Sequence, residues 1–236
     1  MIIISNKKIA KNTYEMVLHE AENNGEILPG QFINLKLQGF YLRRSISAAD
    51  FENDNITIVY KTVGGGTHAM SKLKPGENID ALSPLGNGYN IALIPRSVIL
   101  IGGGGGVPPV YYLGKKLKER DTRLKIILGF KSREDVFWEK KFRDIADEVI
   151  IFTEDGSYGE KGLVTDGFDK AEYICACGPE PMLKALHCKS KGGQYSFEAR
   201  MGCGFGACMG CSCESITGNK RICKDGPVLI QEEIIW

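Results

Sequence analysis

The sequence has no long hydrophobic run and almost no net charge. A membrane-spanning helix needs roughly 18–20 consecutive apolar residues, and no stretch approaches that length. The apolar run at residues 2–4 is also too short for the core of a signal peptide. The formal net charge is +1, which indicates no basic surface for nucleic acid or anionic lipid. We therefore expect a cytoplasmic protein that binds neither nucleic acid nor membrane.

Histidine is also scarce, and its three copies, His19, His68 and His187, are scattered along the chain. No serine, cysteine or lysine stands in a pattern that pairs a nucleophile with a general base. The histidines are therefore interpreted as structural or surface residues. We predict no catalytic residue of the acid–base or nucleophilic kind.

Cysteine, in contrast, is abundant, and five of the eight cysteines lie between Cys203 and Cys223. Disulfides are unexpected in a reducing cytoplasm, whereas local clustering is typical of a metal site. Four residues separate Cys203 from Cys208, two separate Cys208 from Cys211, and eleven lead on to Cys223. This spacing matches the plant-type ferredoxin pattern C-x4-C-x2-C with a distant fourth ligand. It predicts a [2Fe–2S] cluster held by Cys203, Cys208, Cys211 and Cys223.

The alternative for these cysteines is a structural zinc site, which would make the chain a non-enzymatic interaction protein. Zinc sites usually carry two C-x2-C pairs, and this stretch has only one, Cys208 and Cys211. Cys213 offers a fifth thiol, but the ferredoxin pattern has no ligand at its spacing. We therefore expect Cys213 to be a packed thiol and not a ligand.

The order of hydrophobic patterns predicts a multi-domain fold. Short runs at residues 2–9, 14–19, 32–37 and 55–63 are separated by turn signals and indicate a small antiparallel β-barrel. After Pro95 the pattern changes to strands at residues 97–101, 124–128, 149–152 and 173–176, with a helix at residues 110–120 and a capping box at residues 132–135 that opens a second helix. Strands alternating with helices predict an α/β domain with a parallel sheet.

From about Gln194 the sequence becomes rich in glycine and cysteine, with little material for a core of its own. Such a segment depends on a metal centre for its order. We therefore predict three domains: a β-barrel at residues 1–93, an α/β domain at residues 94–192, and a [2Fe–2S] cluster domain at residues 193–236.

A glycine-rich loop at residues 102–106 lies between a predicted buried strand and a predicted helix. Glycines at that position let the backbone approach a pyrophosphate at the helix N-terminus. A second loop, Cys177-Gly178-Pro179, follows another buried strand, at the sheet edge where α/β folds bind ligands. The predicted nucleotide site comprises Gly104, Gly105, Gly106, Val107, Pro108, Cys177, Gly178 and Pro179. The acidic residue of the strict dinucleotide fingerprint is absent, and Lys131 and Arg133 follow the second strand instead.

The segment at residues 43–47 reads Arg-Arg-Ser-Ile-Ser and is expected between strands, and a glycine turn follows at residues 64–67. An arginine with nearby hydroxyls and a glycine turn is typical of a diphosphate site. On spacing alone, a surface turn is the default interpretation.

Together these motifs resemble two nested families. Arg44-Ser45-Ile46-Ser47 and Gly64-Gly65-Gly66-Thr67 resemble the flavin motifs R-x-[YI]-S and G-x-x-[ST] of the ferredoxin-reductase superfamily. The cysteine segment with its flanks, residues 200–204 and 223–227, is similar to that of the electron-transfer subunits of dihydroorotate dehydrogenase B. The similarity extends over essentially the whole chain in the same domain order. Two departures are Ser45, where that family usually has proline, and Ile46, where the superfamily commonly has a tyrosine that stacks on the flavin.

The resemblance implies a FAD site built from Arg44, Ser45, Ile46, Ser47, Val59, Tyr60, Lys61, Gly66 and Thr67. It also implies a partner, an FMN-containing catalytic subunit that oxidises dihydroorotate in pyrimidine biosynthesis, in a heterotetramer of two copies of each chain. Electrons would pass from that partner through the [2Fe–2S] cluster and FAD to NAD+ as the co-substrate. FAD is needed there because it interconverts one-electron and two-electron chemistry.

Related flavin and [2Fe–2S] subunits share most of these motifs. They belong to sulfide dehydrogenases and to NADH-dependent ferredoxin:NADP oxidoreductases. A subunit of that kind is the alternative function for this chain.

Overall fold

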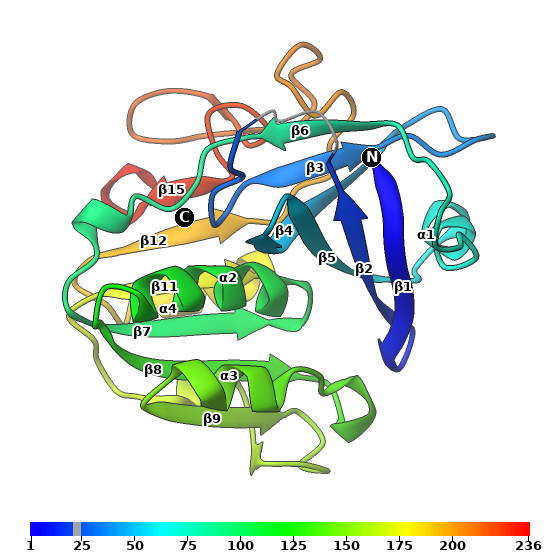
Figure 1. Cartoon of the computed structure of the whole chain (residues 1–236). Coiled ribbons are helices and arrows are strands. Elements are labelled where there is room, and N and C mark those ends of the chain that lie inside the picture. Colours follow the sequence, from blue (N-terminus) through cyan, green and yellow to red (C-terminus); the bar gives the residue numbers. More distant parts are fainter. Residues whose placement is uncertain (21–24) are drawn as a thin grey trace.

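The computed structural model describes residues 1–20 and 25–236. It contains an antiparallel β-domain, an α/β domain with a mostly parallel sheet, and a cysteine-rich lobe near the C-terminus (Figure 1). The predicted order of an antiparallel domain followed by a parallel-sheet domain is thus confirmed.

The antiparallel domain has a sheet in the order β1-β2-β5-β4-β3-β6. The edges of this sheet meet, because the backbone N–H of Ile3 donates to Glu77 O at 2.9 Å and that of Ile79 donates to Met1 O at 2.9 Å. These bonds join β1 to the segment leading into β6 and close the sheet into a barrel. The strand bounds are β1 Ile2–Ala10, β2 Thr13–His19, β3 Phe32–Leu35, β4 Arg44–Glu52, β5 Asn55–Lys61 and β6 Ala81–Leu85, and a short helix α1 spans Gly65–Met70.

The expectation that the arginine–serine segment lies between strands was wrong. It begins strand β4, in which Ser45 pairs with Asn34 and Ser47 pairs with Phe32 of β3. Small polar residues gave this strand no visible hydrophobic alternation. The strand is stable nevertheless, because Ala48 and Ala49 are fully buried at its centre.

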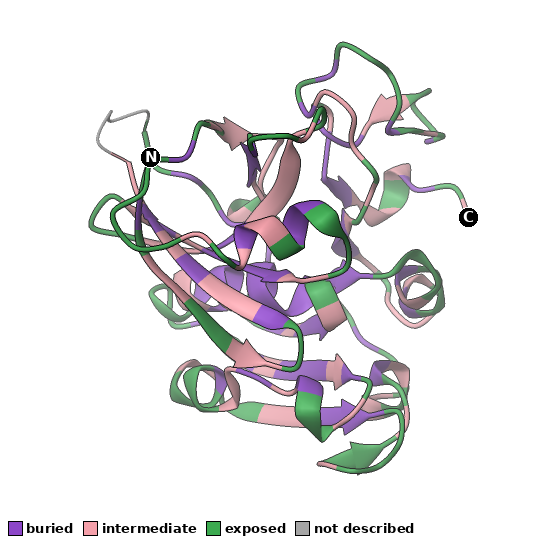
Figure 2. Cartoon of the chain, turned by 90° about the vertical axis from the view of Figure 1, so that its right-hand side faces the viewer, coloured by how far each residue is buried: buried purple, intermediate pink, exposed green. Residues whose placement is uncertain are grey.

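The second sheet runs β10-β9-β8-β7-β11-β12-β15, and every neighbouring pair is parallel except β12 with β15. Side chains of β7 alternate between its faces, so that Leu100 joins the core on one side and Ile101 the core on the other. Figure 2 shows buried residues concentrated along the strands. The bounds are β7 Ser97–Gly103, β8 Arg123–Phe130, β9 Glu148–Thr153, β10 Glu160–Lys161, β11 Ile174–Gly178, β12 Gly193–Phe197 and β15 Val228–Ile230.

Helix α2, Val107–Lys118, packs between this sheet and the barrel. Its Tyr112 belongs to the barrel core, and the hydroxyl donates to Ile27 O at 2.7 Å. Helix α4, Glu180–His187, packs on the opposite face. The predicted capping box does not open a helix. Residues Arg133–Asp135 form a 3-10 turn, in which Ser132 Oγ donates to Asp135 Oδ2, and helix α3 follows at Glu139–Ile145.

The cysteine-rich lobe is the chain between β12 and β15, with one small hairpin of β13, Ser212–Cys213, and β14, Lys220–Arg221. Strands β12 and β15 lie beyond residue 192 and still extend the parallel sheet. Strand pairing therefore crosses the predicted boundary at 192/193, and the domain limits stay a prediction. Among the helices of residues 1–20 and 25–236, none combines the length and apolar character of a membrane span.

Candidate functional site

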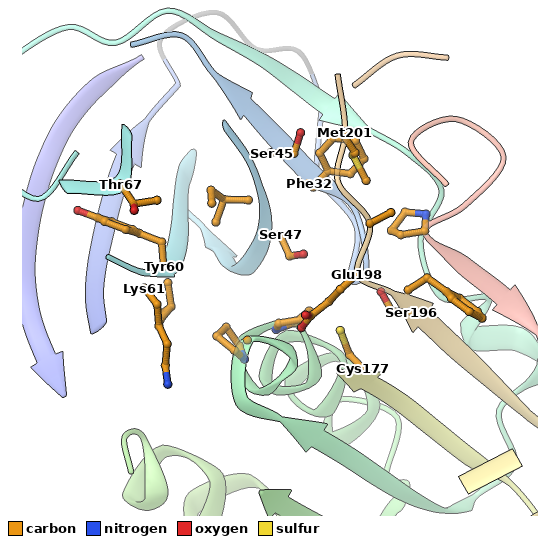
Figure 3. A pocket seen from close by; sticks show the side chains of 18 of the residues that line it. Phe32, Ser45, Ser47, Tyr60, Lys61, Thr67, Cys177, Ser196, Glu198 and Met201 are labelled. Atoms are coloured by element: carbon orange, nitrogen blue, oxygen red, sulfur yellow. The ribbon is translucent and has the colours of Figure 1, made fainter. Parts of the chain in front are cut away.

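A cleft of about 310 Å³ opens between the barrel and the α/β domain. Its walls come from β3, β4 and β5 of the barrel and from the ends of β11 and β12 and the start of α2. Figure 3 shows Tyr60, Lys61 and Thr67 on one side and Cys177, Ser196 and Glu198 on the other. The lining residues include Phe32, Ser45, Ile46, Ser47, Val59, Tyr60, Lys61, Thr67, Gly105, Pro108, Cys177, Ser196, Glu198 and Met201.

The residues predicted for FAD are brought together here. Seven of the nine line the cleft, and the other two, Arg44 and Gly66, contact each other. A Cβ on Gly66 would lie 2.6 Å from Cζ of Arg44, so only glycine leaves room for the guanidinium. The guanidinium also lies over the Phe40 ring, 5.1 Å from its centroid. The glycine turn thus holds an arginine at one fixed place, as a diphosphate site requires.

The side chains of Tyr60 and Lys61 are held by different domains: Tyr60 bonds within the barrel, and Lys61 pairs with the α/β domain. The Tyr60 hydroxyl donates to Asn6 Oδ1 at 2.9 Å, and burial raises the pKa of Tyr60 to about 12. Lys61 Nζ lies 2.9 Å from Asp135 Oδ1, in an ion pair that joins the barrel to the α/β domain. Lys61 also lines a second pocket, so its ammonium stands between two binding spaces.

The residues predicted for NAD divide between the two pockets. Gly105, Pro108 and Cys177 line the cleft, and Gly104 and Pro179 line the second pocket. The other three line neither pocket and shape the backbone instead. Gly106 is one of them, because a Cβ there would collide with the carbonyl of Cys177. Val107 is fully buried, and a Cβ on Gly178 would be 2.5 Å from Met182 Cε.

The second pocket, of about 360 Å³, lies at the carboxyl ends of the parallel strands, where open α/β sheets bind ligands. Lys131 and Glu154 line it with one charge of each sign. Arg133 does not, because its guanidinium lies over the Tyr158 ring, 5.6 Å from the centroid. Of the two cations that follow the second strand, only Lys131 therefore lies at this pocket.

Glu198 and Ser196 were not predicted, because neither belongs to a recognisable sequence motif. The Glu198 side chain lines the cleft and is exposed to solvent there, and partial desolvation of its carboxyl by the cleft walls raises its pKa. Burial also raises the pKa of the Cys177 thiol to about 12, with Glu198 adding to the effect and a bond to Ser196 opposing it. The Cys177 thiol is therefore largely protonated near neutral pH and is not a ready nucleophile.

The four predicted cluster cysteines lie in two contacting pairs. The thiols of Cys203 and Cys208 contact each other, and so do those of Cys211 and Cys223. Cys211 and Cys223 are buried, and Cys208 is exposed. In a two-iron cluster each iron takes two protein ligands, so the thiols are needed as two pairs. Within residues 1–20 and 25–236, no three Cys, His, Asp or Glu side chains converge as a single-ion site requires.

Backbone N–H groups point at these sulfurs. Those of Ala207 and Cys208 lie 3.3 and 3.5 Å from Cys203 Sγ, and that of Cys223 lies 3.4 Å from Cys211 Sγ. Burial opposes ionisation of Cys203, but these N–H groups outweigh it and lower the pKa of Cys203 to about 6. Burial and the neighbouring Cys211 thiol raise the pKa of Cys223 to about 12, so thiolate stabilisation is seen at Cys203 and not at Cys223. N–H groups directed at sulfur atoms are the hydrogen-bond donors that surround an iron–sulfur cluster.

Cys213 is the remaining cysteine of the lobe. It belongs to β13, packs against the core beneath the lobe, and has its pKa raised mainly by burial. Such an environment is typical of a packed thiol. Its exclusion from the ligand set stays a prediction.

Comparison with known proteins points to one family. Residues 198–235 match the family described as the iron-sulfur cluster binding domain of dihydroorotate dehydrogenase B. A protein of Bacillus pumilus (strain SAFR-032), named dihydroorotate dehydrogenase B (NAD(+)), electron transfer subunit, is 40% identical over 250 residues, covering 99% of this chain and 96% of that protein. The protein of the same name from Geobacillus sp. (strain WCH70) is 41% identical, covering 100% and 97%.

A similar solved structure is that of an NADH-dependent reduced ferredoxin-NADP oxidoreductase, described for flavin-based electron bifurcation. It has a TM-score of 0.88 and 30% identity, covering 100% of this chain and 89% of that one. The identity to the named relatives is higher and spans nearly their full length. The chain therefore belongs to the family of dihydroorotate dehydrogenase B electron transfer subunits.

Proposed function

We propose that this chain carries electrons between a partner that oxidises dihydroorotate and NAD+, using a [2Fe–2S] cluster and FAD. One observation carries the proposal: residues of the flavin motif and of the nucleotide motif line the same cleft. Met201, two residues before Cys203, lines that cleft as well. This shared lining supports a proposal in which the flavin, the nucleotide and the cluster are bound next to one another.

The residues present fit FAD. Arg44, seated on Gly66, would bind the diphosphate, and Thr67 lies beside it with its hydroxyl donating to Gly64 O at 3.1 Å. Ser45, Ile46 and Ser47 of β4 would line the flavin ring. When bound, FAD exchanges hydride with a nicotinamide and single electrons with a cluster. The protein's own part in this chemistry is to bind, orient and exclude water.

The nucleotide would occupy the second pocket and reach the cleft. Gly104 and Pro179 would face its phosphates and Cys177 its nicotinamide. Lys61, which lines both pockets, would add a positive charge where the two nucleotides meet. Glu154 and Lys131 would meet the adenosine end, where a carboxylate binds a ribose hydroxyl and a lysine favours a phosphate.

The residues also fit a cluster, with Cys203, Cys208, Cys211 and Cys223 as ligands. When bound, the cluster carries one electron at a time. The lobe exposes Phe205, Met209 and Ile216 beside the ligands, and such a surface favours a partner protein. The partner proposed is an FMN-containing catalytic subunit, in a cytoplasmic heterotetramer of two copies of each chain.

The test is anaerobic purification from the native source with its copurifying chain. We expect FAD, two irons with acid-labile sulfide per chain as a [2Fe–2S] cluster requires, and reduction of NAD+ by dihydroorotate only when the partner is present. A colourless protein with one zinc and no flavin would refute the proposal. Copurification with a ferredoxin- or sulfide-linked partner, and no dihydroorotate activity, would favour the second candidate.

That second candidate is a subunit of a ferredoxin:NADP oxidoreductase or sulfide dehydrogenase. It is favoured by the likeness to the NADH-dependent oxidoreductase structure and by Lys131 in the nucleotide pocket. The higher identity to the named dihydroorotate dehydrogenase subunits favours the first.

A further inference from the structure

Asn34 of β3 connects the flavin cleft with the cysteine lobe. Its side chain is only 1% exposed, and both of its polar atoms are bonded. Nδ2 donates to the carbonyl oxygen of Cys203 at 3.0 Å, and Oδ1 accepts from Ser45 Oγ at 3.2 Å. Ser45 lines the cleft and Cys203 is a proposed cluster ligand. One amide group thus forms a continuous hydrogen-bonded link between the two proposed cofactor sites.

The placement of Asn34 follows from the alternation of β3. Ile33 and Leu35 point into the barrel core, and Phe32 points the other way, into the core beneath the cysteine lobe. Asn34 lies on the same face of β3 as Phe32, because side chains two residues apart in a strand point the same way. This outer face of the barrel would ordinarily be exposed to water, but here the cysteine lobe covers it, and Asn34 is buried. It pairs directly across the ladder with Ser45. Figure 3 shows Phe32, Ser45 and Met201 close together at this part of the cleft.

The cysteine loop is shaped to receive this amide. Gly204, next to Cys203, has φ +82, a conformation that favours glycine, and a Cβ there would be 3.0 Å from Asn34 Cγ and closer still to Nδ2. The backbone of Asn34 is also held, because Arg43 Nη1 donates to Asn34 O at 3.2 Å while it pairs with Asp80. A buried amide fixed on both sides specifies one position for what it bonds.

We propose that Asn34 is a positioning residue that fixes the Cys203 end of the cluster loop against the flavin-binding strand β4. This inference rests on the proposed function and adds a determinant of electron transfer between the cluster and the flavin. Transfer between two fixed centres depends on their separation and orientation, and the Asn34 bonds set both on this side of the lobe. Ser45 takes part through its hydroxyl, which a proline at that position would lack.

The test uses the full chain, purified anaerobically with its cofactors, and the variant Asn34→Leu, which keeps similar volume without polar atoms. After mixing with NADH, flavin and cluster absorbance are followed separately, and the cluster signal is confirmed by electron paramagnetic resonance. NADH donates two electrons to the flavin as a hydride; the cluster accepts one of them and the other stays on the flavin. We expect unchanged FAD and iron contents, an unchanged rate of flavin reduction, and a cluster that is reduced several-fold more slowly, because electron transfer weakens as two centres move apart.

Asn87 supplies the matched control. Its Nδ2 donates to Val228 O of β15 at 2.8 Å and to Asp225 O of the lobe at 3.3 Å, and its Oδ1 accepts from the Val228 N–H at 2.9 Å. Asn87 thereby docks the C-terminal end of the lobe, away from Cys203 in the sequence. Asn87→Leu should leave the rate of cluster reduction at the wild-type value, and equal slowing in both variants would overturn the proposal in favour of general docking. Asn34→Asp keeps the acceptor for Ser45 but loses the donor to Cys203, so its rate of cluster reduction should fall as it does in Asn34→Leu. If the leucine variant fails to hold its cluster, the aspartate variant provides the test instead.

A wild-type rate of cluster reduction in a fully loaded Asn34 variant would also overturn the inference. That result would leave the proposed function intact. Wild-type protein that holds no FAD or no cluster would instead refute the proposed function itself, so the two failures are distinguishable.

Discussion

Gly66 offers a sharp test of the FAD site, because a single methyl group there acts on one identified cation. A Cβ on Gly66 would lie 2.6 Å from Cζ of Arg44 and must displace the guanidinium. The displaced group is the far end of a flexible side chain, so the fold tolerates the change. Gly66 lies in α1 and its φ is not positive, so alanine should favour the helix by up to about 1 kcal/mol. Gly66→Ala should therefore fold normally.

The expected loss is in FAD affinity. A hydrogen bond to a charged group contributes about 1.5–3 kcal/mol, so displacing Arg44 should weaken binding on the order of 10- to 150-fold. Arg44→Ala should weaken it by a similar factor. The double variant should bind no more weakly than either single variant, because both changes remove the same contact.

The assay is titration of the flavin-free chain with FAD, followed by flavin fluorescence. Gly192→Ala is the matched control, because an added Cβ there would make an ordinary 3.4 Å contact with Tyr173, far from the cleft. Equal affinity in Gly66→Ala and Gly192→Ala would refute the role of Arg44. So would losses in the two single variants that add in the double variant.

Three further predictions concern the cluster and the domain interface. Cys213→Ser should retain the wild-type iron and sulfide content, whereas Cys211→Ser should lose it, and metal analysis that finds equal loss in both would show the ligand set to be wrong. Asp135→Asn breaks the ion pair with Lys61 and should lower the free energy of unfolding in urea by about 1–3 kcal/mol. Burial opposes ionisation of Asp135, but the ion pair with Lys61 outweighs burial and lowers the pKa of Asp135. The stabilisation from the pair is therefore complete above about pH 4 and is lost as the pH falls below that value. Below about pH 4, the stability of Asp135→Asn should depend less steeply on pH than that of the wild type. Removal of the cluster by a chelator should expose residues 198–227 to protease while FAD stays bound, and simultaneous digestion of the whole chain would contradict this.

The clustering of the cysteines and the change from an antiparallel to a parallel sheet could be expected from the sequence because both depend on local patterns. The C-x4-C-x2-C spacing lies in one loop, and the buried strand at residues 97–101 has the continuous apolar run of a strand covered on both faces. The glycine loop likewise lies where expected, between β7 and α2. Each of these features is determined by residues that are neighbours along the chain.

What could not be expected depends on contacts between distant segments. Strand β4 was missed because its side chains are small and polar, and its stability comes from pairing with β3 and β5 on both sides. Asn34 and Glu198 carry no motif, and each acquires its role only when the domains meet. The close packing of Gly106 against the Cys177 carbonyl joins two segments that are far apart in the chain, and no spacing encodes it.

The lobe's dependence on the rest of the chain has a consequence for how the proposed cluster is placed. Cys211 and Cys223 are buried in the same core as the parallel sheet, so the lobe has no separate core to fold around. Its two ends are continuous with β12 and β15 of that sheet, while Asn34 and Asn87 of the barrel domain bond its two flanks. The sheet and the barrel together therefore fix the lobe beside the cleft. The position of the proposed cluster relative to the proposed flavin therefore requires that both domains are folded. By this argument the cluster lobe is an integral part of the chain and not an independently folded ferredoxin attached to a barrel.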